Sequence, residues 1–220
     1  MLRFFAIAII LIAVPAYAQM RSVEPKACEP RGAKVVRGDE ARELREEAAR
    51  LRANAQDVSR RQERLLLKLD DGKTVELTDC PYGDTAYTYL YERYDEAGQF
   101  YVVRKAAYED FSYTLVMKRT GRLYEAYGTP IWASDKSRFL TVACSLLPPR
   151  ASLTISVPSR DSLATEAEFP LPCEKESCSA RWDYQSWISV SCTPHDSTGK
   201  KGSEFVLMRG NDGTWRKFGR

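Results

Sequence analysis

Four stretches of the chain share one layout: a strand-like run, a short turn and a second strand-like run. They span Leu65 to Leu77, Tyr113 to Ala126, Leu153 to Phe169 and Phe205 to Phe218. Three place a glycine at the same point of the turn, at Gly72, Gly121 and Gly213, and the third has Ser162 or a neighbour there. Glycine supplies the positive φ angle that tight hairpin turns require. The chain is therefore expected to consist largely of antiparallel hairpins.

A second element also recurs. The segment from Trp132 to Cys144 is similar to the segment from Trp182 to Cys192 once a two-residue gap is allowed. The repeat is about 50 residues long with four strands per unit, which is the size of a propeller blade. We predict a mainly β fold, an antiparallel meander of about three propeller-like four-stranded units. Because closed propellers have at least four blades, an open stack and another antiparallel sandwich both remain alternatives.

The segment from Pro130 to Leu140, Pro-Ile-Trp-Ala-Ser-Asp-Lys-Ser-Arg-Phe-Leu, is more specific. It resembles the Pro-x-Trp-Ser-Pro-Asp-Gly-Lys motif of TolB-type and related exported propellers with WD40-like (PD40-type) repeats. The region from about residue 65 to the end resembles uncharacterised secreted bacterial proteins that carry such repeats. The resemblance implies that the motif is structural, with Asp135 fixing a loop and Trp132 packing between blades. It implies no activity.

One long amphipathic helix is predicted over residues 39–64, before a β-rich domain over residues 65–220. Asp39 is the expected N-cap, and Glu40 and Glu43 in the first turn suit the positive end of the helix dipole. Apolar or small residues recur at steps of three and four, at Ala41, Leu44, Ala48, Leu51, Ala55, Val58, Gln62 and Leu65. That spacing indicates one helical stripe, and the charged remainder is expected to be a solvated face.

Two interpretations of this helix stay open. The stripe is long enough for a coiled coil that makes the protein a homo-oligomer through residues 39–65. Half of the stripe is alanine, however, so a two-stranded coil would bury little apolar surface. The favoured interpretation is a helix that lies along the β domain or projects from it.

The first 18 residues have the layout of a secretory signal peptide: Arg3, an apolar run from Phe4 to Val14, and Ala16-Tyr17-Ala18 before a cut at Gln19. Residues 19–38 are expected to form an extended leader. The sequence has 33 Lys and Arg and 30 Asp and Glu. Removing the signal peptide removes Arg3, so the formal net charge of the mature chain is 32 − 30 = +2. So small a charge argues against nucleic acid as a partner. No later apolar run is long enough for a membrane span. We expect a periplasmic or secreted protein.

Six cysteines in an exported chain indicate up to three disulfides. Cys173 and Cys178 lie in one polar loop, so a local bridge between them is the first prediction. By similarity and elimination, the other predicted pairs are Cys144 with Cys192 and Cys28 with Cys80. A zinc site at Cys173 and Cys178 is disfavoured because the chain has a single histidine. No metal or other cofactor is predicted.

No catalytic set is recognisable in the sequence. His195, the only histidine, is expected to be a loop residue, and no Gly-x-Ser-x-Gly nucleophile elbow accompanies it. Ten of the twelve tyrosines lie between Tyr82 and Tyr127. Tyr87, Tyr89 and Tyr91 share one strand face, which is either core or a binding face for a protein or glycan at the cell envelope.

The expected function follows from export, disulfides and repeats. We predict a non-enzymatic cell-envelope protein that acts as a binding or structural module. The first alternative is the coiled-coil assembly protein, and the second is a hydrolase that uses carboxylates not identified by their spacing.

Overall fold

The computed structural model describes residues 18–19, 22–23, 28, 33, 39–83, 86–107, 111–144, 151–173, 176–194 and 202–219. These ranges hold one helix, α1 (Glu40–Ala53), and a succession of antiparallel strands. The strands are β1 (Ala18–Gln19), β2 (Ser22–Val23), β3 (Val58–Arg61), β4 (Arg64–Lys68), β5 (Thr74–Thr78), β6 (Tyr87–Asp95), β7 (Phe100–Ala107), β8 (Phe111–Met117), β9 (Leu123–Ala126), β10 (Ile131–Trp132), β11 (Phe139–Ala143), β12 (Ser152–Pro158), β13 (Leu163–Pro170), β14 (Glu176–Tyr184), β15 (Trp187–Pro194), β16 (Ser203–Arg209) and β17 (Trp215–Phe218).

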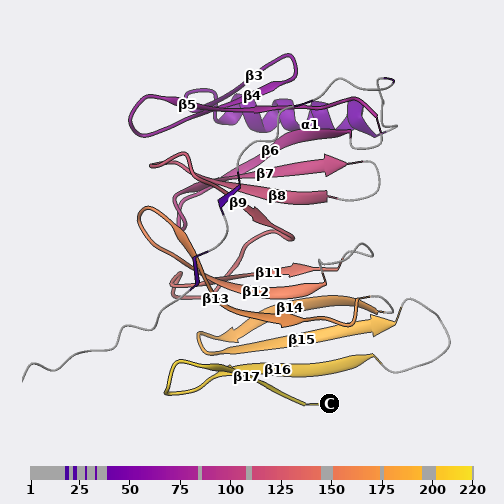
Figure 1. Cartoon of the computed structure of the whole chain (residues 1–220), viewed down its shortest axis with the longest axis vertical. Helices are drawn as coiled ribbons and strands as arrows, with labels where there is room; N and C mark the ends of the chain where they lie inside the picture. Colours follow the sequence, from indigo (N-terminus) through magenta and orange to yellow (C-terminus); the bar gives the residue numbers. More distant parts are fainter. Residues whose placement is uncertain are drawn as a thin grey trace, which may run out of the picture.

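The strands form four sheets that lie one above another along the long axis of the molecule (Figure 1). Helix α1 and the sheet β3-β4-β5 form the first layer, which we call the cap. Unit 1 is β6–β9, unit 2 is β10–β13 and unit 3 is β14–β17, each a four-stranded meander. The short strands β2 and β1 add to the last strands of units 1 and 2, β9 and β13. The predicted mainly β meander of about three four-stranded units is confirmed, and its sheets are open.

The core consists of three apolar clusters, one between each pair of neighbouring layers. The first joins the cap to unit 1, the second joins unit 1 to unit 2, and the third joins unit 2 to unit 3. Successive residues of one strand belong to different clusters, since side chains alternate between the two faces of a sheet. Val103 of β7 belongs to the first cluster and Val102 to the second. Units 1 and 2 are therefore covered on both faces, and in unit 1 the strands β6, β7 and β8 contain long runs of consecutive buried residues.

The four predicted hairpins are all present, as β4–β5, β8–β9, β12–β13 and β16–β17. Gly72, Gly121 and Gly213 have positive φ angles of 83°, 69° and 79°. In the third hairpin, Ser159 and Ser162 close the turn instead, with the Ser159 hydroxyl accepting from the Ser162 N–H at 3.1 Å. These turns fix the register of each hairpin.

The predicted helix 39–64 is wrong in its second half. Helix α1 ends at Ala53, and the chain turns at Asn54 into β3, which pairs with β4. Of the stripe positions after Ala53, Ala55 and Gln62 are exposed, and Val58 and Leu65 are buried as strand residues of the cap sheet. The helical part of the stripe is therefore only about two heptads long, which is short for a coiled coil.

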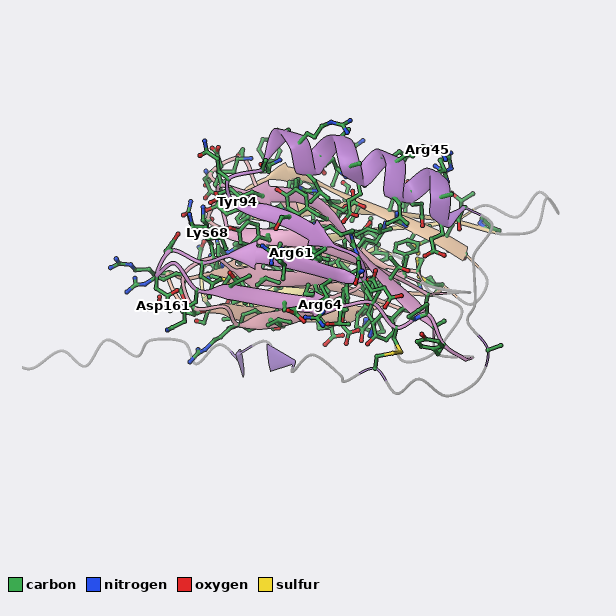
Figure 2. The ribbon with its side chains drawn as sticks, turned by 90° about the horizontal axis from the view of Figure 1, so that it is seen from above. Arg45, Arg61, Arg64, Lys68, Tyr94 and Asp161 are labelled. Atoms are coloured by element: carbon green, nitrogen blue, oxygen red, sulfur yellow. A yellow bond between two sulfur atoms is a disulfide. The ribbon has the colours of Figure 1, made fainter. Side chains whose placement is uncertain are left out.

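The expectation that the charged face of the helix is solvated is also wrong. Glu43 and Glu47 are the buried residues of α1, and they face β6 and β7 of unit 1. Leu44, Ala48 and Leu51 are only partly buried. The helix lies flat on unit 1 because its acids meet arginines of the sheets, as described below. Outside the stack the cap is polar, and Figure 2 shows Arg61, Arg64 and Lys68 on its strands.

Units 2 and 3 each donate an indole hydrogen bond to the unit that precedes them. Trp132 at the start of unit 2 donates to the Asp95 carboxylate of unit 1 at 2.8 Å and stacks on Phe100. Trp182 in the first strand of unit 3 donates to the Ile131 carbonyl of unit 2, also at 2.8 Å. The two repeated tryptophans of the sequence thus occupy corresponding places between units. Asp135 closes the loop after Trp132 by accepting from the Ser137 N–H at 3.0 Å.

Three disulfides connect the six cysteines. The predicted Cys28–Cys80 bridge is confirmed. The other two predicted pairs are wrong, because Cys144 pairs with Cys173 and Cys178 with Cys192. Each of these bridges stays within one unit. Cys178 and Cys192 face each other on the neighbouring strands β14 and β15. Cys144 comes directly after β11, and Cys173 comes shortly after β13 of the same unit.

Among the residues that the structure describes, no helix combines the length and apolar character that crossing a membrane requires. The predicted signal peptide and leader lie mostly outside the described residues, as does His195.

Candidate functional site

Tyr87, Tyr89 and Tyr91 do not form an exposed face. Their exposed fractions are 7%, 5% and 0%, and they pack between unit 1 and the cap. Burial raises the pKa of the Tyr91 hydroxyl to about 12, and burial together with neighbouring charges raises the pKa of Tyr89. Of the two interpretations of this strand face, core is therefore correct.

The same three residues form the edge of unit 1, and charged side chains of the cap cover that edge. The carboxylates of Asp79 and Glu47 accept from the N–H groups of Tyr89 and Tyr91, at 2.8 and 2.7 Å. The guanidinium groups of Arg60 and Arg50 donate to the carbonyls of the same two tyrosines. Tyr87 exchanges two backbone hydrogen bonds with Cys80. The cap thus supplies β6 with the hydrogen bonds that a further strand would supply.

Arg60 holds the two carboxylates of this cluster together. Its guanidinium donates to Glu47 at 2.7 and 3.0 Å and to Asp79 at 2.8 Å. In a neighbouring cluster, Arg104 forms ion pairs with Glu43 at 2.8 Å and with Glu92 at 3.0 Å. Burial raises the pKa of Asp79 to about 6, although the Arg60 charge and the Tyr89 N–H act in the opposite direction. Perturbed carboxyls often mark active sites. Here, however, one oxygen of Asp79 accepts from the Tyr89 N–H of the strand edge and the other accepts from Arg60.

The raised pKa of Asp79 gives a testable pH dependence. The folded chain keeps the Asp79 proton up to about pH 6, whereas the unfolded chain releases it near 3.8, the ordinary pKa of an aspartate. Since the folded state binds more protons in this window, the contribution of Asp79 to stability falls as pH rises from about 4 to 6. We expect the stability difference between wild type and Asp79→Asn to decline over this range in urea titrations. A constant difference, or one that grows with pH, contradicts the assignment.

The sulfur atoms of Cys144, Cys173 and Cys178 lie within 4.8 Å of one another. All three are in disulfides, and a disulfide sulfur is not the thiolate that a metal ion binds. A hollow of about 410 Å³ lies beside them, with Phe111, Tyr113 and Ile131 in its apolar lining. Phe111 and Ile131 are 53% and 38% exposed.

The most distinctive surface is the face of unit 3 that points away from unit 2, which we call the terminal face. One face of unit 3 packs on unit 2 through Ile188, Val190, Phe205 and Leu207. The intervening residues of β15 and β16 are exposed or half-buried, in contrast to units 1 and 2. The cap covers one end of the stack, and no described layer covers the other (Figure 1).

Apolar residues gather on one half of the terminal face. Tyr184 pairs with Trp187 across the turn from β14 to β15, and Trp187 pairs with Met208 of β16. Their exposed fractions are 69%, 37% and 38%, and that of Phe218 on β17 is 50%. Val206 lies between Ser189 and Phe218 in the register. These five residues form one continuous surface, the terminal patch: Tyr184, Trp187, Val206, Met208 and Phe218.

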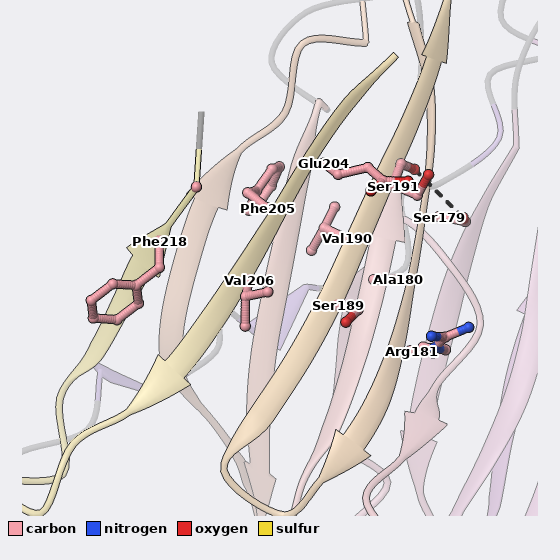
Figure 3. Close-up of a pocket in the computed structure, with 11 residues that line it drawn as sticks. Ser179, Ala180, Arg181, Ser189, Val190, Ser191, Glu204, Phe205, Val206 and Phe218 are labelled. Carbon is pink, nitrogen blue, oxygen red and sulfur yellow. Dashed lines mark hydrogen bonds between the residues drawn. The ribbon is translucent and has the colours of Figure 1, made fainter. Parts of the chain in front are cut away.

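The other half of the terminal face carries hydroxyl groups. Ser177 and Ser179 of β14 pair with Thr193 and Ser191 of β15. A hollow of about 530 Å³ lies across this face, and Figure 3 shows Arg181, Ser189, Val206 and Phe218 on its four strands. Ser179 donates to the Ser191 carbonyl at 3.5 Å. The face thus changes from hydroxyl-bearing to apolar within one sheet.

Charged residues border the terminal patch on both edge strands. On β14, Asp183 accepts from Arg181 at 3.0 Å and from the Ser189 hydroxyl, and these bonds lower the pKa of its carboxyl. On β17, Arg216 pairs with Asp212, and its side chain is 57% exposed. Both edges therefore present one acid and one arginine at neutral pH.

The sequence did not mark this surface. Its strands alternate apolar and polar residues, which predicts one buried face. The alternation alone does not show that Trp187, Met208 and Phe218 gather on the face that is not buried, because that depends on the register between β15, β16 and β17. Comparisons with protein-family models, curated proteins and solved structures find no match to this chain.

Proposed function

We propose that this protein is an exported, non-enzymatic interaction module of the cell envelope that docks a protein through its terminal face. The observation that carries the proposal is the terminal patch at the uncovered end of a stack whose other end is capped. Repeat proteins commonly end in polar faces, and the cap follows that rule. An exposed apolar patch with a polar rim is typical of an interaction site.

The composition of the patch favours a protein over a glycan as the partner. Aromatic residues, methionine and arginine are enriched in protein interfaces. Trp187, Met208 and Arg216 meet that description, and Arg216 pairs with Met208 across β16 and β17. The serine and threonine half offers hydroxyls, but within the described residues its strands carry no aromatic ring between those hydroxyls on which a sugar would stack.

Export is supported by the signal-like residues 1–18 and by three disulfides, which persist in oxidising compartments. The absence of enzymatic activity is proposed because the buried carboxylates of the described chain serve structural contacts. Glu47 and Asp79 bind the edge of β6, and Glu166 joins units 2 and 3.

Site-specific photo-crosslinking in the producing cell tests the proposal. A photoreactive phenylalanine analogue replaces Trp187 in one variant and Arg61, exposed on the cap, in the matched control. We expect a discrete protein adduct from position 187 and none from position 61. Equal adducts from both positions, or none from position 187, would argue against a docking role for the terminal face.

A further inference from the structure

The terminal face is self-complementary, and from this we infer that its partner is a second copy of the same chain. The inference rests on the proposed docking role and names the partner. Two units 3 would pack face to face about a two-fold axis parallel to their strands. The result is a six-unit stack with one polar cap at each end.

The register of unit 3 determines which residues would meet. Rotation about such an axis reverses the order of strands, so β14 of one copy lies over β17 of the other and β15 over β16. Trp187 pairs with Met208, and Met208 with Arg216, in the sheet of one copy. Across the interface Trp187 therefore meets Met208 of the second copy, and this contact occurs twice.

The charges at the edges follow the same symmetry. Tyr184 of β14 is level with Trp187, Met208 and Arg216 in the register, and Asp183 precedes it at the register shift. Arg216 of the second copy therefore comes to lie over Tyr184 and beside Asp183, and this contact also occurs twice. Arg181 comes to lie over the ring of Phe218, a favourable place for a guanidinium group. Asp183 thus lies near an arginine of the second copy at both ends of the interface, whereas the alternative axis, perpendicular to the strands, would place each strand over itself and would not bring Trp187 over Met208. Charge complementarity of this type selects one orientation.

The available area suits a reversible dimer of modest affinity. The four strands of unit 3 are nine, eight, seven and four residues long and about 4.8 Å apart, so they cover roughly 440 Å² in plan on each copy. Two copies would bury about 900 Å², which is in the range of weak, reversible complexes. Face-to-face packing of twisted sheets is also the way in which antiparallel sheets form sandwiches.

Charge exchange tests both the partner and the geometry. Light scattering of the purified mature protein at tens of micromolar is expected to give twice the mass of one chain. Asp183→Arg and Arg216→Asp each place like charges together twice, so each variant alone is expected to dissociate with a Kd raised at least about 100-fold. A mixture of the two variants restores opposite charges at both positions and should recover the dimer, as should the double variant D183R/R216D.

Controls separate this result from a folding defect and from other oligomers. Arg61→Asp makes the same charge change on the cap and is expected to leave the mass unchanged. Met208→Lys removes the central apolar contact without touching Asp183, which has partners in its own chain, and should also give monomers. Urea midpoints near that of wild type verify that each variant folds.

Three outcomes would overturn the inference: a monomer at all concentrations, single variants that stay dimeric, or a mixture that stays monomeric. A monomer that still gives a crosslink from position 187 to another protein would overturn the inference while leaving the proposed function intact. A monomer without any such crosslink would overturn both.

Discussion

Replacing Glu47 by alanine is expected to destabilise the protein by about 3–5 kcal/mol, the usual loss when one member of a buried ion pair is removed. The side chain of Glu47 is 1% exposed, and its carboxylate binds Arg60 twice and the Tyr91 N–H once. Its removal leaves Arg60 with Asp79 as its remaining carboxylate partner and leaves a buried N–H of β6 without its acceptor. The measurement is the free energy of unfolding in urea at pH 7.

Helix α1 provides the matched control. Glu46 is the preceding residue, and its ion pair with Arg42 at 2.9 Å is exposed. Glu46→Ala is therefore expected to change stability by less than about 0.5 kcal/mol. Glu47→Gln keeps an acceptor for Tyr91 and should lie between the two. Equal effects of Glu46→Ala and Glu47→Ala would show that helix propensity, and not the buried contact, determines the loss.

The second large effect is expected at Glu166, which joins units 2 and 3. Its side chain is 1% exposed. One oxygen accepts from Arg138 at 2.7 Å and from Trp215 at 3.0 Å, and the other forms an ion pair with Arg209 at 2.9 Å. Glu166→Ala leaves two partly buried guanidinium groups without this carboxylate, so a loss of about 3 kcal/mol, the low end for a buried pair, is expected. Trp215 fluorescence should change in the folded state, because the indole N–H loses its acceptor.

Glu168 lies two residues along the same strand and is exposed, so Glu168→Ala is the matched control. A pH profile adds an independent test. Burial acts to raise the pKa of Glu166, but the bonds from Arg138 and Trp215 and the charges of Arg138 and Arg209 lower it overall. Its contribution to stability is therefore complete above its unfolded pKa of about 4.5 and declines as pH falls further. An unchanged acid limb in Glu166→Gln would contradict this role.

The hairpins were predictable because their signals are local. Gly72, Gly121 and Gly213 specify turns that need a positive φ, and the flanking residues alternate or are continuously apolar. The register between strands of one hairpin follows from the turn. The repeat of Trp132 and Trp182 was also visible, although the acceptors of their N–H groups, on other units, were not.

The helix was extended too far because the stripe continues through Val58 and Leu65 in helical spacing. The positions are apolar for another reason: Val58 pairs with Leu67, and Leu65 with Leu77, in the cap sheet. A short strand with two arginines, Arg60 and Arg61, has no strand signal of its own. Burial of Arg60 depends on Glu47 and Asp79, which lie 13 and 19 residues away.

The disulfide pairing and the terminal patch could not be predicted from the sequence, because they too depend on which segments lie together in the fold. Cys173 and Cys178 are close in sequence, but each is paired within its own unit. The terminal patch combines residues of β14 to β17, and its exposure depends on where the stack ends. Alternation along β15 and β16 separates the residues into two faces, but which face is uncovered depends on how the units stack.

The charged cover on β6 also protects the molecule from aggregation. A nine-residue strand rich in tyrosine, with its backbone groups free, would be a template on which other chains could add as strands in a fibril. Asp79, Arg60, Glu47 and Arg50 occupy those backbone groups at Tyr89 and Tyr91. The cap can open only if buried charges separate, so the edge is shielded for as long as the cap stays in place.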